Sequence, residues 1–178
     1  MKKEGKIQMK NSYSVKDITK MAMMAAITFV GIYAVKIPSP HGYSHMGDCM
    51  IFLSVLLLGT RKGALAGGIG AALSDLLGGY MHWIVPTFVI KYIMAFVMEM
   101  FIDKIMPESK LNWFIGSVVG GIVQIFLYTA VKVVMFDWAY AITSVPGLTS
   151  QTITGVVLGA VLVTLLGKAG VMQRLKEM

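Results

Sequence analysis

The sequence has few charged residues and almost no cysteine. Only 14% of its 178 residues are charged, whereas 56% are hydrophobic and the mean hydropathy is +0.72. A typical soluble domain is about a quarter charged, so too few polar groups are present here to cover a soluble surface, and the composition also excludes disorder. The single cysteine, Cys49, cannot form an internal disulfide or build a cysteine metal site alone. The composition therefore indicates a protein whose solvent is the lipid bilayer.

Mostly apolar segments recur along the chain, separated by breaks rich in proline and glycine. Six of them approach the length of roughly 20 residues that is needed to cross the hydrocarbon layer, at 17–36, 46–60, 62–80, 84–106, 112–136 and 149–167. The second is weak, because its apolar run at 49–58 is nearer half a span, and we expect it to be short, tilted or partly re-entrant. The sequence predicts an all-α membrane protein, a bundle of six transmembrane helices over residues 14–170, with tails at 1–13 and 171–178.

The distribution of basic residues tests the six predicted membrane crossings, because cytoplasmic loops carry an excess of Lys and Arg. The three connections at 37–47, 80–84 and 137–148 contain no Lys or Arg. Six crossings place most of the 16 basic residues on the other side of the membrane: Lys2, Lys3, Lys6, Lys10, Lys16, Lys20, Arg61, Lys62, Lys104, Lys110, Lys168, Arg174 and Lys176. We therefore expect both termini to be cytoplasmic, and we interpret the net charge of +7 as a sign of membrane topology rather than of nucleic-acid binding.

Small residues recur four positions apart in several of the segments. Glycine pairs of this kind begin at Gly63, Gly116 and Gly155, and the first segment contains Ala22-x-x-x-Ala26. Such strips let two helix backbones approach closely in lipid. We interpret the glycine strips as packing within the bundle, and docking of another membrane protein is the alternative.

Ionisable residues inside a membrane are costly and usually mark a function. Asp75, Lys91 and Lys132 are predicted at similar depths near the outer ends of the third, fourth and fifth segments. This pattern favours a polar pocket open to the outside. Asp75 and Lys91 are candidates for an ion pair, since each would otherwise be an uncompensated charge. The alternative is a purely structural pair, with the other lysine snorkelling to the headgroups.

Aromatic and amide side chains surround this charged layer. Trp83, Tyr128 and Trp138 flank it and are candidates to stack on a flat heteroaromatic ligand. Gln124 lies two turns deeper than Lys132, and we expect it to form the floor of the pocket. About half of the aromatic residues in this region are also explained by the belt at the headgroup level.

The polar connection near 37–48 is long for so small a protein, and its Pro and Gly content suits a lid over the pocket. Its candidate ligand contacts are His41, Tyr43 and His45. His41 and His45 with Asp48 also have metal-binding side chains. His41 and His45 are four residues apart, which would place them on one face of a helix. Pro40 disfavours a regular helix here, so this spacing does not indicate a shared ligand, and we predict no metal site.

Three stretches carry a resemblance to a known family. Residues 63–67, 74–80 and 86–91 read Gly-Ala-Leu-Ala-Gly, Ser-Asp-Leu-Leu-Gly-Gly-Tyr and Pro-Thr-Phe-Val-Ile-Lys. Together with six short helices and Ala22-x-x-x-Ala26, they resemble the substrate-binding S component of an energy-coupling factor (ECF) transporter. The resemblance covers essentially the whole chain.

The resemblance implies a high-affinity binding subunit for a water-soluble vitamin. It implies docking to a membrane coupling subunit that is driven by two cytoplasmic ATPases, so that ATP is used by the partners and this chain needs no cofactor. Ala22 and Ala26 match the family's docking motif. Lysines and aromatic rings in the pocket favour a pyridoxine-like or hydroxymethylpyrimidine-like ligand first, then riboflavin or pantothenate.

Two other function classes remain open from the residues alone. A stand-alone carrier or channel would transport a small polar solute without ATP, but the two halves show no clear inverted repeat. An intramembrane enzyme would need a reactive group near an acid or base, and Cys49 with His45 and Asp48 is the only local candidate. No oxyanion donor accompanies that trio, so we do not expect an enzyme.

Overall fold

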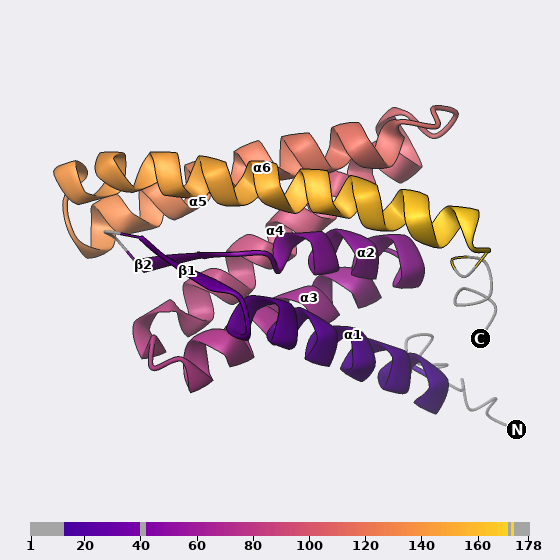
Figure 1. Cartoon of the computed structure of the whole chain (residues 1–178), viewed down its shortest axis with the longest axis horizontal. Helices are drawn as coiled ribbons and strands as arrows, with labels where there is room; N and C mark the ends of the chain where they lie inside the picture. The colour runs from indigo at the N-terminus through magenta and orange to yellow at the C-terminus, as the bar shows by residue number, and fades with distance from the viewer. Residues whose placement is uncertain (1–12, 40–41, 171, 173–178) are drawn as a thin grey trace, which may run out of the picture.

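The computed structural model describes residues 13–39, 42–170 and 172, which form six α-helices and one short β-hairpin (Figure 1). The side chains of residues 37–39, 42, 43 and 60 are outside this description. The elements in chain order are α1 (Val15–Tyr33), β1 (Lys36–Ser39), β2 (Gly42–His45), α2 (Asp48–Leu58), α3 (Thr60–Leu77), α4 (Ile84–Met100), α5 (Asn112–Met135) and α6 (Trp138–Lys168). A short 3₁₀ helix (Met81–Trp83) precedes α4, and a π-helical turn (Phe101–Ile105) follows it.

Side-chain caps define the beginnings of the first and last helices. The Ser14 hydroxyl accepts from the backbone N–H of Asp17, and the Asp17 carboxylate accepts from that of Ser14, which is a capping box. At α6, the Asp137 carboxylate accepts from the N–H of Tyr140 at 2.8 Å. Both caps satisfy backbone donors that a helix start would otherwise leave unpaired.

Helix α2 is short and lies at the centre of the bundle. It has 11 residues, and it packs against α1, α3, α4 and α6. Its buried residues Ile51, Phe52 and Val55 join Met94 and Met98 of α4 in the main hydrophobic cluster. The half-length apolar segment of the sequence is therefore a helix enclosed by protein.

The glycine strips bring helix backbones together inside the bundle. A Cβ added at Gly63 would lie 2.6 Å from the carbonyl oxygen of Ser54, so α3 approaches the backbone of α2. Gly120 likewise brings α5 against α4, and a Cβ added at Gly155 would lie 2.6 Å from the Cβ of Asp48. The interpretation of these strips as internal packing is confirmed.

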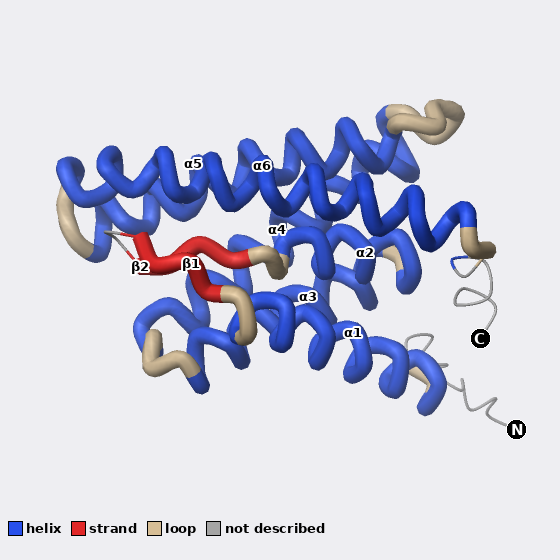
Figure 2. The backbone as a smooth tube through the Cα atoms, viewed as in Figure 1, coloured by secondary structure: helices blue, strands red, loops and turns tan. Residues whose placement is uncertain are grey.

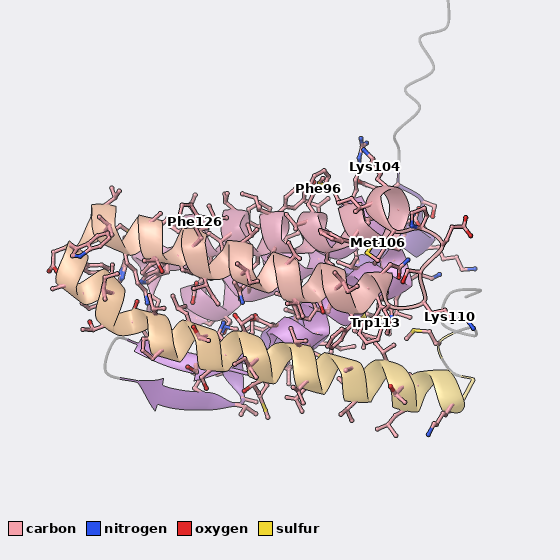
Figure 3. The ribbon with its side chains drawn as sticks, turned by 90° about the horizontal axis from the view of Figure 1, so that it is seen from above. Phe96, Lys104, Met106, Lys110, Trp113 and Phe126 are labelled. Atoms are coloured by element: carbon pink, nitrogen blue, oxygen red, sulfur yellow. The ribbon has the colours of Figure 1, made fainter. Side chains whose placement is uncertain are left out.

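The outer faces of the bundle are apolar. Phe96 of α4 and Phe126 of α5 project from the surface, and Phe126 is 71% exposed (Figure 3). Within the described residues, three helical stretches are long and apolar enough to cross a membrane: Met81–Ile105, Asn112–Met135 and Trp138–Lys168. The prediction of a six-helix, all-α membrane protein is confirmed.

Two connections differ from the sequence expectation. The polar connection after α1 forms an antiparallel hairpin in which Lys36 pairs with His45, and β2 lies against α6 and α1 (Figure 2). Residues 138–148, which include Pro146, belong to α6, although the sequence placed them in the connection at 137–148. The Asp137 cap starts the helix early, and a membrane helix tolerates the proline because neighbouring groups can satisfy the freed backbone carbonyl.

The two ends of the bundle differ in charge. The hairpin, the α3–α4 connection and the α5–α6 connection lie at one end, which we call the hairpin end (Figures 1 and 2). The start of α1, the α2–α3 junction, the α4–α5 connection and the end of α6 lie at the other. Judged by the elements that carry them, the basic residues at this second end are Arg61, Lys62, Lys104, Lys110 and Lys168, and we call it the basic end.

Candidate functional site

A cavity of about 90 Å³ lies toward the hairpin end of the bundle, which is room for several water molecules. Side chains from α1, β2, α3, α4, α5, α6 and the α3–α4 connection surround it. Its lining residues are Ile32, His45, Ala71, Asp75, Tyr80, Trp83, Thr87, Tyr128, Lys132, Leu148 and Gln151. Residues far apart in the sequence therefore meet in one partly polar space.

One part of the cavity wall is aromatic. The rings of Trp83 and Tyr128 have centroids 5.8 Å apart, and the planes are tilted by 52°. The Tyr128 hydroxyl donates to the hydroxyl oxygen of Thr87 at 3.3 Å. This contact orients the Tyr128 ring, so the wall offers a flat ligand two aromatic surfaces.

The same cavity contains one acidic and one basic side chain. Asp75 and Lys132 are each only 7% exposed. The ammonium nitrogen of Lys132 lies 5.9 Å from the Trp83 ring and 5.9 Å from the Tyr140 ring, within the range of cation–π attraction. The cavity can therefore offer a ligand a charged donor and a charged acceptor.

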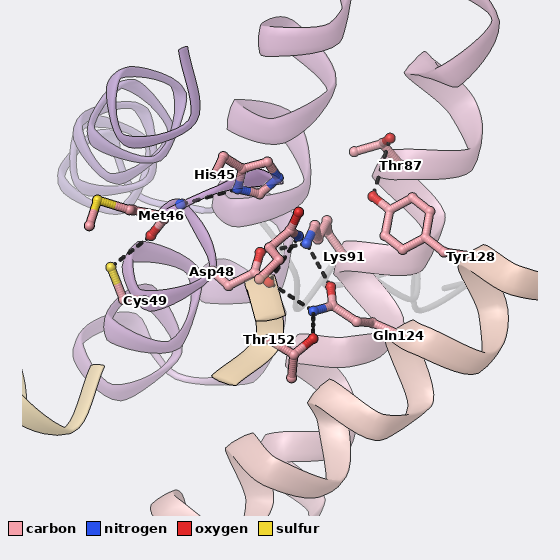
Figure 4. Close-up of polar contacts among 11 residues, drawn as sticks. His45, Met46, Asp48, Cys49, Thr87, Lys91, Gln124, Tyr128 and Thr152 are labelled. Atoms are coloured by element: carbon pink, nitrogen blue, oxygen red, sulfur yellow. Dashed lines mark hydrogen bonds and ion pairs between the residues drawn. The ribbon is translucent and has the colours of Figure 1, made fainter. Parts of the chain in front are cut away.

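Beside the cavity, a buried ion pair joins two helices (Figure 4). The Nζ of Lys91 lies 2.5 Å from Oδ1 of Asp48, and both side chains are fully buried. Lys91 also donates to Oε1 of Gln124 at 2.6 Å, while Nε2 of Gln124 donates to Oδ2 of Asp48 at 2.7 Å. These contacts form a closed ring of charge-assisted hydrogen bonds between α2, α4 and α5.

Helix α6 completes this network through two adjacent residues. Nε2 of Gln124 donates to the Thr152 hydroxyl oxygen at 2.8 Å, and Nε2 of Gln151 donates to Oδ2 of Asp48 at 3.3 Å. We call Asp48, Lys91, Gln124, Gln151 and Thr152 the central network. Through Gln151 it reaches the cavity wall.

The central network corrects the ion pair that the sequence suggested. The carboxylate partner of Lys91 is Asp48 and not Asp75, which lies on the cavity wall. The hairpin explains the difference, because it turns the chain back so that Asp48 begins α2 inside the bundle rather than ending a surface loop. Gln124 is also not a cavity-lining residue; Lys91, Asp48 and Thr152 occupy its amide group.

His45 connects the hairpin to this region. Its ring is 9% exposed, and its Nδ1 accepts the backbone N–H of Gly47 at 3.2 Å. The proton of the neutral ring is therefore on Nε2. Burial lowers the pKa of His45 from 6.5 to about 4, with the nearby Lys91 and Lys36 acting in the same direction and Asp48 opposing them.

The structure brings together half of the site residues expected from the sequence. Asp75, Trp83, Tyr128, Lys132 and His45 line the cavity. Lys91 and Gln124 belong to the central network beside it.

Of the three remaining expected contacts, only Trp138 can be compared with the cavity. Trp138 does not line it, because it begins α6 with its side chain 67% exposed. His41 lies outside the described residues, as does the side chain of Tyr43.

Other functional candidates escaped the sequence interpretation. Thr87 and Gln151 line the cavity, and Asp48, which the sequence suggested only for a metal site or a reactive trio, anchors the central network. Two signals were present: Thr87 precedes Lys91 by four residues, which places them on one helix face, and Gln151-Thr152 is a polar pair inside an apolar segment. In the part of the chain that the structure describes, no cluster of His, Cys, Asp or Glu could hold a metal ion.

Comparison with known proteins gives three matches. Residues 12–168 match a family described as the S component of ECF-type riboflavin transporters. A Pyrococcus woesei protein described as an uncharacterized protein in a gap 3′ region is 32% identical over 125 residues, covering 70% of this chain and 82% of that protein. The thiamine precursor transporter HmpT of Lactococcus lactis subsp. cremoris is 24% identical over 174 residues, covering 96% of this chain and 99% of the relative.

Proposed function

The chain belongs to the ECF-type riboflavin transporter S component family, and from this premise we propose that its cavity binds a small, flat, single-ring vitamin or vitamin precursor. The protein is a membrane transport subunit and not an enzyme. The observation that carries the proposal is the convergence of Trp83, Tyr128, Asp75 and Lys132 on one confined cavity. The rings of Trp83 and Tyr128 can stack on a heteroaromatic ligand. Asp75 and Lys132 can form hydrogen bonds with the polar groups at the edge of that ligand.

Hydroxymethylpyrimidine-like and pyridoxine-like compounds fit these features best. Each has one aromatic ring, ring nitrogen and small polar substituents, for which Lys132 is a donor and Asp75 an acceptor. The similarity to a thiamine precursor transporter supports this class. Riboflavin supplies an aromatic surface but is larger, and pantothenate supplies a charge but no ring to stack on Trp83.

The proposal extends to the partners and to the energy source. We infer that the chain docks to an ECF coupling subunit, and that two partner ATPases drive release of the ligand to the inside, with no cofactor in this chain. Ala22 and Ala26 are exposed on α1 beside exposed Ile18, Met23 and Ile27. A surface with small side chains at its centre allows a partner helix to approach closely.

The proposed orientation follows from charge. The basic end faces the cytoplasm of a bacterial cell by the positive-inside rule, which places both ends of the chain there. The cavity then lies toward the outside, where a scarce nutrient is captured.

Binding measurements on the purified chain test the proposed function. The protein in detergent is titrated with hydroxymethylpyrimidine, pyridoxine, riboflavin and pantothenate, and binding is followed by calorimetry. We expect tight binding of one of the two single-ring compounds. Preference for pantothenate, or no binding of any single-ring compound, would overturn the ligand class. Uptake by the chain alone in liposomes without ATP would instead favour a stand-alone carrier.

A further inference from the structure

Gln151 is a cavity residue whose amide group has a defined orientation. It lies on α6, it is 5% exposed, and it lines the cavity while its Nε2 donates to Oδ2 of Asp48 at 3.3 Å. A glutamine amide has one end that donates and one that accepts. The direction in which the amide faces therefore decides what the cavity offers at this position.

Asp48 determines that direction. Its Oδ1 receives the ammonium group of Lys91 at 2.5 Å, so the carboxylate is charged and can only accept hydrogen bonds. The amide group of Gln151 must then turn its NH₂ toward Oδ2 of Asp48, which already accepts from Gln124. If the amide group were reversed, Oε1 of Gln151 would face Oδ2 of Asp48. Two acceptors would then lie opposite each other in a buried site without a hydrogen bond, which carries a large desolvation penalty.

The amide oxygen of Gln151 is consequently available to the cavity. Among the described residues, no group donates a hydrogen bond to Oε1 of Gln151. A polar atom on the wall of a cavity is normally paired by water or by a ligand. Gln124 is a useful contrast, because Lys91 already donates to its amide oxygen at 2.6 Å.

We propose that Gln151 is a specificity-determining residue whose amide oxygen accepts a hydrogen bond from an N–H or O–H donor on the ligand ring. Asp48, held by Lys91, is the positioning residue that fixes the amide. The inference rests on the proposed function and deepens it: the cavity selects rings with a donor substituent, such as an amino group, over rings that lack it.

A matched ligand pair tests this inference directly. Hydroxymethylpyrimidine with its ring amino group is compared with the analogue in which hydrogen replaces that group. We expect the wild-type protein to prefer the amino compound by about tenfold or more, because one buried hydrogen bond is lost with the analogue. In Gln151→Met, which keeps an unbranched side chain, the preference should nearly disappear through weaker binding of the amino compound.

Leu148→Met is the control variant, because Leu148 lines the same cavity from α6 and carries no polar group. It should change the affinity for both compounds together and keep their ratio. Gln151→Leu serves as a second variant if Gln151→Met does not give a single peak in gel filtration.

The outcomes separate the inference from the proposed function. Wild-type protein that binds neither compound, nor pyridoxine, overturns the proposed function and the inference with it. Binding of both compounds with equal affinity overturns the inference alone. A preference that persists in Gln151→Met also overturns it, since another acceptor such as Asp75 would then read the amino group.

Discussion

The ammonium nitrogen of Lys91 lies 2.5 Å from Oδ1 of Asp48, and no solvent reaches either side chain. The pair joins the fourth helix to the start of the second, and Gln124 bridges both partners. A bare charge at this place would be strongly destabilising in low dielectric. The two residues therefore hold the centre of the bundle, while the cavity beside them remains available for a ligand.

Removing one charge of this pair should destabilise the fold. In Lys91→Met the carboxylate of Asp48 stays buried without its cation, and we expect a loss of about 3–5 kcal/mol in the free energy of unfolding. Thermal unfolding in detergent measures it. The double variant Lys91→Met with Asp48→Asn leaves no uncompensated charge and should recover most of the loss. An unchanged melting temperature in the single variant would contradict the structural role of the pair.

A methyl group at Gly155 should disturb the contact between α6 and α2. The added Cβ would lie 2.6 Å from the Cβ of Asp48, so one helix must shift. We expect Gly155→Ala to lower stability by about 1–3 kcal/mol, the usual cost of overpacking. Gly167→Ala in the same helix is the control, because nothing lies within 4 Å of the added atom. Equal effects of the two substitutions on the melting temperature would argue against the close approach.

The two tryptophans at the hairpin end should differ in their effect on ligand binding. Trp83 lines the cavity, whereas Trp138 is 67% exposed and lies outside it. Loss of one stacking ring costs about 1 kcal/mol or more, so Trp83→Ala should weaken binding by roughly fivefold or more. Trp138→Ala should leave the affinity unchanged, and calorimetry with hydroxymethylpyrimidine compares them. The reverse order would place the ligand elsewhere.

Bulky side chains on α1 should separate ligand binding from transport. Ala22→Leu with Ala26→Leu enlarges two exposed positions that do not line the cavity. We expect binding to persist and uptake into cells to be lost, because a partner helix can no longer approach α1 closely. Ala130→Leu, on an exposed position of α5, is the control and should not affect uptake. Normal uptake by the α1 double variant would exclude this docking surface.

His45 should make the folded state sensitive to acid. Because the pKa of His45 falls from 6.5 to about 4 on folding, the folded state favours the neutral ring. Its contribution to stability is complete above about pH 6.5 and is lost as the pH falls toward 4, by roughly 3 kcal/mol in total. Melting temperatures measured between these pH values should fall less in His45→Gln than in wild type. His82→Gln, at an exposed histidine, should retain the wild-type acid sensitivity.

The sequence predicts the arrangement of helices well, because lipid imposes simple rules on segment length. The structure confirms six helices, and it explains the weak second segment by enclosing α2 among its neighbours. The glycine spacing correctly indicates close packing. The extent of α6 was wrong, since Pro146 is a weaker stop signal in a membrane helix than in a soluble one.

The site was only partly predictable. Asp75, Trp83, Tyr128 and Lys132 were found because polar and aromatic residues are conspicuous in apolar segments. The partner of Lys91 could not be found in the same way, because pairing depends on the hairpin that carries Asp48 into the bundle. A periodicity argument assigns a residue to a helix face, but it does not say which neighbouring helix that face meets.

The most direct test of this account is a structure of the protein determined with hydroxymethylpyrimidine bound. The account predicts that the ring lies against Trp83 and Tyr128, with Asp75, Lys132 and Gln151 around its polar edge. A ligand bound elsewhere on the chain, with the cavity filled by protein side chains, would contradict it.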